Sequence, residues 1–231
     1  MIADTRAELP WTAIETVLLD MDGTLLDLHY DNHFWQVHVP ARYAEKHGLD
    51  HAEAHAECFR RYQAKAGTLQ WYCVDYWSEQ LELDIVQLKR ELTHLIAVHP
   101  DVVEFLAVLR AAGKRVALVT NAHRKSLNLK MALTGLALHF DAMHVSHEYG
   151  HAKEEPMFWQ ALNGNERYDK TRTLLVDDSL PVLRSAREYG IAHLRAVLQP
   201  DTRQPDKDVG EFAAIRRFRE IMPMLAEEAR V

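Results

Sequence analysis

The chain has 231 residues, which suits one large α/β domain or a core domain with a smaller insertion. Acidic residues outnumber Lys and Arg by 34 to 27, and the net charge of −7 argues against a nucleic-acid polymer or an anionic membrane as partner. The two cysteines, Cys58 and Cys73, form no Cys-x-x-Cys pair, and no apolar stretch is long enough to span a bilayer, so we expect a reducing, cytoplasmic setting.

The first predicted strand, residues 16–20, is an apolar run that ends on Asp20. A second carboxylate, Asp22, follows two residues later, and a Gly-Thr turn then ends the strand. Ligands of open α/β sheets bind at the carboxyl ends of strands, so both carboxylates are expected to face one crevice. Such a pair can hold a hard cation or divide the roles of nucleophile and proton donor. The alternative, an acidic helix cap, explains one Asp but not the whole Asp-x-Asp-Gly-Thr pattern.

Residues 29–99 differ in composition from the rest of the chain, because helix formers and aromatic residues replace glycine and runs of β-branched residues. We predict helices over 31–46, 51–66, 71–80 and 84–97. Pro40 is expected to kink or split the first helix, and charged residues such as Lys89 to lie on solvent faces. We therefore predict a core domain made of residues 1–28 and 100–231, with a helical domain inserted over residues 29–99.

Two aromatic groups, at residues 34–35 and 71–77, stand out in this insertion. Most of their rings are expected to fill the core of the insertion, since Trp and Tyr often do so in small helical bundles. Flat rings beside amides and carboxylates also suit a planar base, which can be stacked on a ring and hydrogen-bonded at its edge. The candidate substrate-binding residues in the insertion are Asn32, Trp35, Trp71, Tyr72 and Asp75.

The remainder of the chain is expected to complete a parallel sheet with helices on both faces. The predicted strands are residues 115–120, 140–145, 173–176 and 192–197. The predicted helices are residues 101–112, 125–133, a helix opening at Pro156, 180–189 and 211–227.

Polar residues follow two of these strands and precede one helix. Thr120 and Asn121 can hydrogen-bond phosphate oxygens, although the same pair is ordinary turn chemistry. Lys153 lies just before a helix that begins with proline, where a lysine is usually a solvated charge. Asp177 and Asp178 follow a buried strand, where adjacent acids are costly unless they meet a cation or hydrogen-bond donors. One of the two could instead cap the next helix.

Together these residues resemble the four motifs of the haloacid dehalogenase (HAD) superfamily, in the order and spacing of that family. The resemblance covers almost all of the chain. It implies the HAD fold, a Rossmann-like doubly wound parallel sheet with a small all-helical cap inserted after the first strand. It also implies that Asp20 is the nucleophile of a phosphomonoester hydrolase and that Asp22 is its general acid and base. Thr120, Asn121 and Lys153 would bind the phosphoryl group.

The same resemblance implies a Mg²⁺ cofactor. Asp20, the backbone carbonyl of Asp22 and Asp178 would bind the metal directly. Asp177 would hold either metal-bound waters or the lysine of the third motif, Lys153.

The substrate is suggested by a narrower resemblance. Residues 18–35 and 71–81, together with residues 176–179, resemble the bacterial GMP/IMP 5′-nucleotidase branch of the superfamily. This implies a purine nucleoside monophosphate, although the aromatic cap also fits a small sugar phosphate or phosphoglycolate, handled by a phosphatase or a mutase. A dehalogenase is disfavoured because it does not keep an acid at the position of Asp22. An inactive binding protein with this fold is disfavoured because all four motifs are present.

Overall fold

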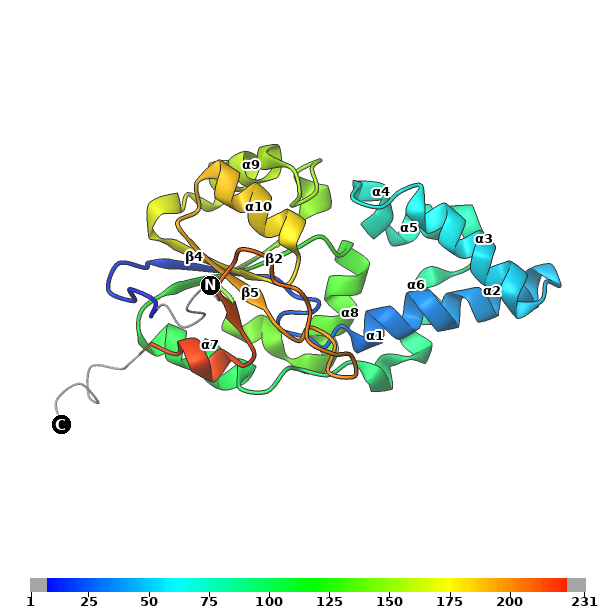
Figure 1. Cartoon of the computed structure of the whole chain (residues 1–231), viewed down its shortest axis with the longest axis horizontal. Helices are drawn as coiled ribbons and strands as arrows, with labels where there is room; N and C mark the ends of the chain where they lie inside the picture. Colours follow the sequence, from blue (N-terminus) through cyan, green and yellow to red (C-terminus); the bar gives the residue numbers. More distant parts are fainter. Residues whose placement is uncertain (1–7, 224–231) are drawn as a thin grey trace.

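A computed structural model describes residues 8–223, in which a central sheet lies between helices and a further group of helices projects from one end (Figure 1). The sheet is entirely parallel, with the strand order β3-β2-β1-β4-β5-β6. Its strands are β1 (Thr16–Leu19), β2 (Arg115–Thr120), β3 (Ala142–Val145), β4 (Thr173–Asp177), β5 (His193–Val197) and β6 (Ala214–Ile215).

The middle strands are buried on both sides because helices cover both faces of the sheet. On one face, Val17 and Leu19 of β1 pack with residues of α7 (Val102–Ala111) and α8 (Arg124–Thr134). On the other face, Leu18 packs with residues of α9 (Pro156–Glu166) and α10 (Leu180–Tyr189). This arrangement explains why β1 and β4 are continuous apolar runs rather than alternating ones.

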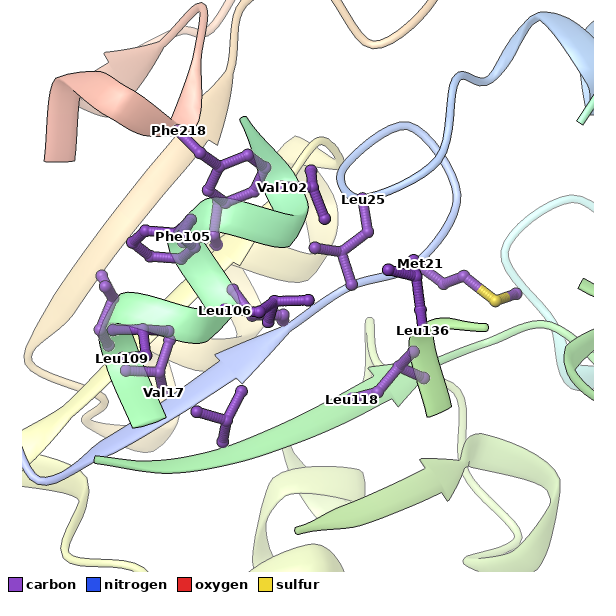
Figure 2. Packing of buried hydrophobic residues seen from close by; sticks show 14 of the residues in the cluster. Val17, Met21, Leu25, Val102, Phe105, Leu106, Leu109, Leu118, Leu136 and Phe218 are labelled. Atoms are coloured by element: carbon purple, nitrogen blue, oxygen red, sulfur yellow. The ribbon is translucent and has the colours of Figure 1, made fainter. Parts of the chain in front are cut away.

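Figure 2 shows the first of these faces, where side chains of α7 point at the sheet. Phe105 is fully buried, and its ring centroid lies 4.8 Å from that of Phe218. Leu106 and Leu109 also face β1. Burial of these side chains fixes the helix against the strand that ends on Asp20.

The helices between β1 and α7 enclose a hydrophobic cluster of their own, with Phe34 and Trp77 buried in it. They are α1 (His29–His33), a π-helical turn (Phe34–His38), α2 (Val39–His47), α3 (His51–Gln63), α4 (Leu69–Tyr72), α5 (Val74–Leu81) and α6 (Ile85–Glu91). We call this group the cap. The predicted fold class, a parallel α/β core with a helical insertion after the first strand, is confirmed. The predicted domain limits, 1–28 with 100–231 and 29–99, stay a prediction.

Two predicted cap helices are interrupted. The one over 31–46 contains a π-helical turn directly before Val39 and Pro40, because proline has no N–H to continue the helical ladder. The one over 71–80 breaks at Cys73, whose backbone is extended. The helices predicted over 51–66 and 84–97 end early, at Gln63 and Glu91, and a 3-10 turn (Thr93–Leu95) follows the second.

The helix predicted over 211–227 is wrong within the described residues, and positions 224–227 lie outside them. Ala214–Ile215 instead form β6, which pairs with the edge strand β5, and a 3-10 turn (Phe218–Ile221) follows. Phe212, Ile215, Phe218 and Ile221 recur every three residues, a spacing typical of a helix, and all four are buried. Pairing with the open edge of β5 outweighed the helical pattern.

We predict that Phe105→Ala lowers the free energy of unfolding by about 3–5 kcal/mol, because it opens a cavity between α7 and the sheet. Chemical denaturation monitored by circular dichroism measures the loss. Leu138→Ala is the control: this side chain is 81% exposed, and its loss is expected to stay within about 0.5 kcal/mol. Equal losses in the two variants would contradict the core assignment.

Candidate active site

Three neighbouring strands deliver polar residues to the same edge of the sheet. Asp20 directly follows β1, Thr120 ends β2 and Asp177 ends β4. The strands are parallel and in register, so their carboxyl ends meet. The backbone N–H of Asp20 donates to the carbonyl of Val176 at 3.1 Å, which fixes the first carboxylate beside the end of β4.

Lys153 is a buried cation between two of these carboxylates. Its Nζ lies 2.6 Å from Oδ1 of Asp20, 2.7 Å from Oδ2 of Asp177 and 3.0 Å from the carbonyl of Val119. Burial works to lower the pKa of Lys153, but Asp177 and Asp20 outweigh it and the pKa is raised. The lysine is therefore a fixed positive charge.

The loop that carries Lys153 is held from two sides. The Lys153 N–H donates to Oδ1 of Asn121 at 2.9 Å. The indole N–H of Trp159, in the first turns of α9, donates to the Lys153 carbonyl at 3.0 Å. Trp159, which follows Pro156 in α9, therefore anchors the backbone of Lys153.

Three carboxylates form a group that fits a hard divalent cation. Oxygens of Asp20, Asp177 and Asp178 lie within 4.8 Å of one another. Oδ2 of Asp20 is buried and has no hydrogen-bond partner among the described residues. Burial raises the pKa of each of these carboxyls to about 6. An all-oxygen donor set with an unsatisfied buried oxygen is the chemistry that Mg²⁺ prefers.

Gly23 brings the turn after Asp22 into contact with Asp178. Its φ is +88°, and a Cβ at this position would lie 2.8 Å from Cγ of Asp178 and 3.1 Å from Cβ of Pro200. Any larger residue would both strain the backbone and displace the carboxylate. On its other side, Asp178 accepts from Nζ of Lys207 at 3.1 Å.

A cavity of about 560 Å³ connects this acidic edge to the cap. It has the size of a typical small-ligand site. The predicted site residues that line it are Asp20, Asp22, Thr120, Asn121, Lys153, Asp177 and Asp178 from the core, and Asn32, Trp35, Trp71 and Tyr72 from the cap. Two of the cap residues also touch the core: Asn32 donates to Oδ2 of Asp201 at 2.8 Å, and Tyr72 to Oε1 of Glu154 at 2.5 Å.

Asp75 does not line this cavity, in contrast to its predicted role in substrate binding. Its carboxylate is about half exposed and pairs with Nζ of Lys125 at 2.6 Å. The preceding residue of α5, Val74, lines the cavity, whereas Asp75 forms an ion pair between the cap and α8 of the core.

The sequence analysis missed a second group of buried charges. Nζ of Lys130 lies 2.6 Å from Oδ1 of Asp22 and 2.5 Å from Oδ2 of Asp31. Lys89, which we expected on a solvent face, is buried and lies 3.1 Å from Oδ1 of Asp31. The signal for Lys130 was its place three residues after Leu127, on the apolar face of α8.

Burial raises the pKa of Asp22 to about 6; the nearby Asp31 adds to the shift and Lys130 opposes it. For Lys130 burial acts in the opposite direction, but the two carboxylates outweigh it and the pKa is raised. Asp22 therefore has a pKa well above the ordinary value for an aspartate, beside a lysine whose pKa is also raised.

We predict that Gly23→Ala weakens Mg²⁺ binding at least about tenfold, the equivalent of about 1.4 kcal/mol, because the new methyl group displaces Asp178. Isothermal titration calorimetry measures the affinity. Gly113→Ala is a matched control, since Gly113 also has a positive φ but a Cβ added there would have nothing within 4 Å. Equal affinities in the two variants would count against Asp178 as a ligand.

We predict that Mg²⁺ stabilises the protein more at pH 7 than at pH 5. In the metal-free fold the pKa of Asp20, Asp177 and Asp178 is about 6, against an ordinary 3.8. The folded state thus binds more protons than the unfolded state between about pH 4 and 6, and stability falls as pH rises through this window. A metal that binds the ionised carboxylates offsets this loss, by about 2.7 kcal/mol at 100 times its Kd. Thermal melts at both pH values, with Mg²⁺ or EDTA, measure the difference; a larger gain at pH 5 would contradict it.

Comparison with known proteins places this site in a family. Residues 14–190 match the family model of the haloacid dehalogenase-like hydrolases. The chain is 39% identical over 217 residues to the GMP/IMP nucleotidase YrfG of Escherichia coli (strain K12), covering 94% of this chain and 98% of that protein. The protein of the same name from Shigella flexneri matches equally.

Among solved structures, a HAD phosphatase from Thermococcus onnurineus is similar in fold. Its TM-score is 0.76 at 23% identity, over 90% of this chain and 95% of that one. The family resemblance predicted from the four motifs is confirmed. The chain belongs to the haloacid dehalogenase-like hydrolases, in the same nucleotidase branch as these two relatives, and is a phosphomonoester hydrolase.

Proposed function

We propose that this hydrolase is a cytoplasmic, Mg²⁺-dependent 5′-nucleotidase for purine nucleoside monophosphates, with GMP and IMP as the leading substrates. The observation that carries the proposal is the continuous cavity that joins the acidic strand ends to an aromatic cap. The names of the two curated relatives support the same substrate class. Among residues 8–223, no helix is long and apolar enough to cross a membrane.

In the proposed first step, a carboxylate oxygen of Asp20 attacks the phosphorus atom of the substrate. The bond from phosphorus to the ribose oxygen breaks, and Asp22 gives its proton to that oxygen. In the second step Asp22 takes a proton from water, the water oxygen bonds to phosphorus, and the aspartyl-phosphate bond to Asp20 breaks. Inorganic phosphate and the nucleoside are released, and both carboxyls return to their starting states.

The peripheral phosphate oxygens are proposed to bind Lys153 and Thr120. Oγ1 of Thr120 already accepts from the N–H of Ala122 at 3.0 Å, so its own hydrogen is available to donate. Lys153 offsets the charge that accumulates when a carboxylate approaches a phosphate dianion.

Asn121 is more constrained than its predicted role implies. Its Oδ1 accepts from Lys153 N and its Nδ2 donates to Oε2 of Glu154 at 2.9 Å. Its side chain also hydrogen-bonds the hydroxyl of Tyr72, so most of its polar groups already have a partner within the protein. We propose that Asn121 acts mainly by shaping the loop that holds Lys153.

The acidic group is proposed to hold Mg²⁺ through Asp20, Asp178 and the backbone carbonyl of Asp22. Asp177 is proposed to hold Lys153, given the 2.7 Å contact between them. When bound, the metal would screen the negative charges of the phosphate and the carboxylates.

The cap end of the cavity offers the chemistry of base recognition. The rings of Trp35 and Trp71, 6.4 Å apart between centroids, both line it. Gln36 and Gln63 line it too, and their amides can both donate and accept at the edge of a base. A purine would gain stacking on the rings and hydrogen bonds to the amides, whereas a small sugar phosphate would leave the rings uncovered.

We predict that a panel of phosphomonoesters yields Mg²⁺-dependent phosphate release led by GMP and IMP, ahead of AMP, pyrimidine nucleotides, phosphoglycolate and hexose phosphates. A colorimetric phosphate assay with and without EDTA measures kcat/KM for each. Asp20→Asn is the control and is expected to lose at least about 10³-fold, since it removes the nucleophile.

The outcomes separate the parts of the proposal. A sugar phosphate or phosphoglycolate in first place would keep the chemistry and overturn the substrate. Activity that survives Asp20→Asn would overturn the nucleophile. Absence of release from every ester would favour a mutase or a binding protein.

A further inference from the structure

Lys130 is one of the most deeply buried charged groups of the described chain, with 1% of its surface exposed, and the mechanism above does not use it. We propose that Lys130 is a positioning residue that orients Asp22 for proton transfer to the leaving group and, through Asp31, ties this orientation to the position of the cap. The proposal rests on the proposed function, in which Asp22 exchanges protons with the substrate and water.

Lys130 connects three separate parts of the chain. Lys130 itself lies on α8 of the core. It contacts Oδ1 of Asp22, in the turn after β1, at 2.6 Å, and Oδ2 of Asp31, in the first helix of the cap, at 2.5 Å. Its Nζ also lies 4.9 Å from the ring centroid of Tyr30, which packs on the same side. One ammonium thus bridges the core, the catalytic turn and the cap.

Stability alone is a weak reason for this arrangement. A buried ion pair costs several kcal/mol in lost hydration, and well-packed apolar residues of similar volume often stabilise a fold equally well or better. The position would suit a leucine or methionine, since the neighbouring Leu127 and Met131 already pack against the sheet. A lysine here does something that an apolar residue cannot do, which is to hold the carboxylate of Asp22.

The hold on Asp22 suits a general acid. Lys130 engages Oδ1, so Oδ2 can carry the proton that passes to the leaving oxygen as the bond from phosphorus to that oxygen breaks. The same carboxylate then takes a proton from the attacking water, and Lys130 keeps its own protons throughout. Proton transfer of this kind depends strongly on direction and distance, so a carboxylate free to rotate would serve it poorly.

The link to the cap follows from the other half of the bridge. Asp31 lies in α1, where the chain enters the cap, and its Oδ1 also accepts from Lys89 of α6 at 3.1 Å. Helix α6 of the cap also contacts α8 of the core at the junction of the two. The bridge between Lys130 and Asp31 exists only while the cap lies against α8. Asp22 is therefore fully held only when the cap is in this position.

The test compares two leaving groups. A nucleoside leaves as an alkoxide and needs a proton, whereas 4-nitrophenolate leaves without one. We expect Lys130→Met to lower kcat/KM for the preferred nucleotide by about 10- to 100-fold, within the range of general acid catalysis, and for 4-nitrophenyl phosphate by less than about threefold. The ratio kcat/KM includes the step in which the leaving group departs but not the later hydrolysis of the aspartyl-phosphate, so it reports on proton donation to the leaving group.

Three reference variants make the result specific. Asp22→Asn must show the same selective loss, and the double variant Asp22→Asn with Lys130→Met must lose no more selectivity than Asp22→Asn alone, since Lys130 acts through Asp22. Asp31→Asn is expected to give a smaller loss in the same direction. Lys114→Met, whose Nζ donates to the carbonyls of Trp11 and Ile14 far from the cavity, is expected to leave the ratio of the two substrates unchanged.

The outcomes are distinguishable. Suppose that Asp22→Asn lowers kcat/KM selectively for the nucleotide, but that Lys130→Met lowers kcat/KM equally for both substrates or for neither. The proposal about Lys130 is then overturned and the proposed function stands. If Asp22→Asn is not selective, the acid role of Asp22 fails and the proposal fails with it. If Lys130→Met does not fold, Lys130→Met with Asp31→Asn replaces it; this variant removes one charge of each sign from the buried group and is expected to show the same selective loss.

Discussion

The ammonium of Lys153 is the contact on which the site depends. It joins the carboxylate of Asp20 after β1, the carboxylate of Asp177 at the end of β4 and the carbonyl of Val119 in β2, so one charge links three neighbouring strands. Without it, Asp20 and Asp177 would be two buried like charges. Removing one partner of such a buried group typically lowers the free energy of unfolding by about 3–5 kcal/mol, as much as truncating a large side chain in the core. The fold and the catalytic machinery are therefore stabilised by the same contact.

The lysine can play this part because the surrounding fold fixes it. The amide of Asn121 and the indole of Trp159 hold the backbone of Lys153 from opposite sides. Trp159 is itself buried between α9 and α10, where Oγ of Ser185 accepts a second hydrogen bond from its indole at 3.1 Å. Packing on the face of the sheet covered by α9 and α10 thus fixes the position of the Lys153 charge at the sheet edge. The charge is in place before a substrate binds, which is electrostatic preorganisation.

The buried charges fall into two groups with different partners. The group around Lys153 lies wholly within the core and is fixed by the sheet. The group around Lys130 spans the core and the cap and depends on how the two meet. This division matches the division of labour in the proposed function, since the first group handles the phosphoryl group and the second handles the leaving group that the cap encloses.

The sequence by itself determined the strands, the order of the four motifs and the family, because short apolar runs followed by carboxylates, a hydroxyl or a lysine at fixed intervals are local patterns. It did not determine the structure after residue 211, where the spacing of apolar residues predicted a helix but Ala214 and Ile215 pair with the edge strand β5. It also placed Lys89 on a solvent face, although this side chain is buried, and it overlooked Lys130. Whether a charged side chain is buried, and which partner it meets, depends on residues about 60 to 110 positions away in the sequence, such as Asp31 for Lys89 and Asp22 for Lys130. Only the tertiary structure brings such residues together, since desolvation and pairing are properties of the packed molecule rather than of any one segment.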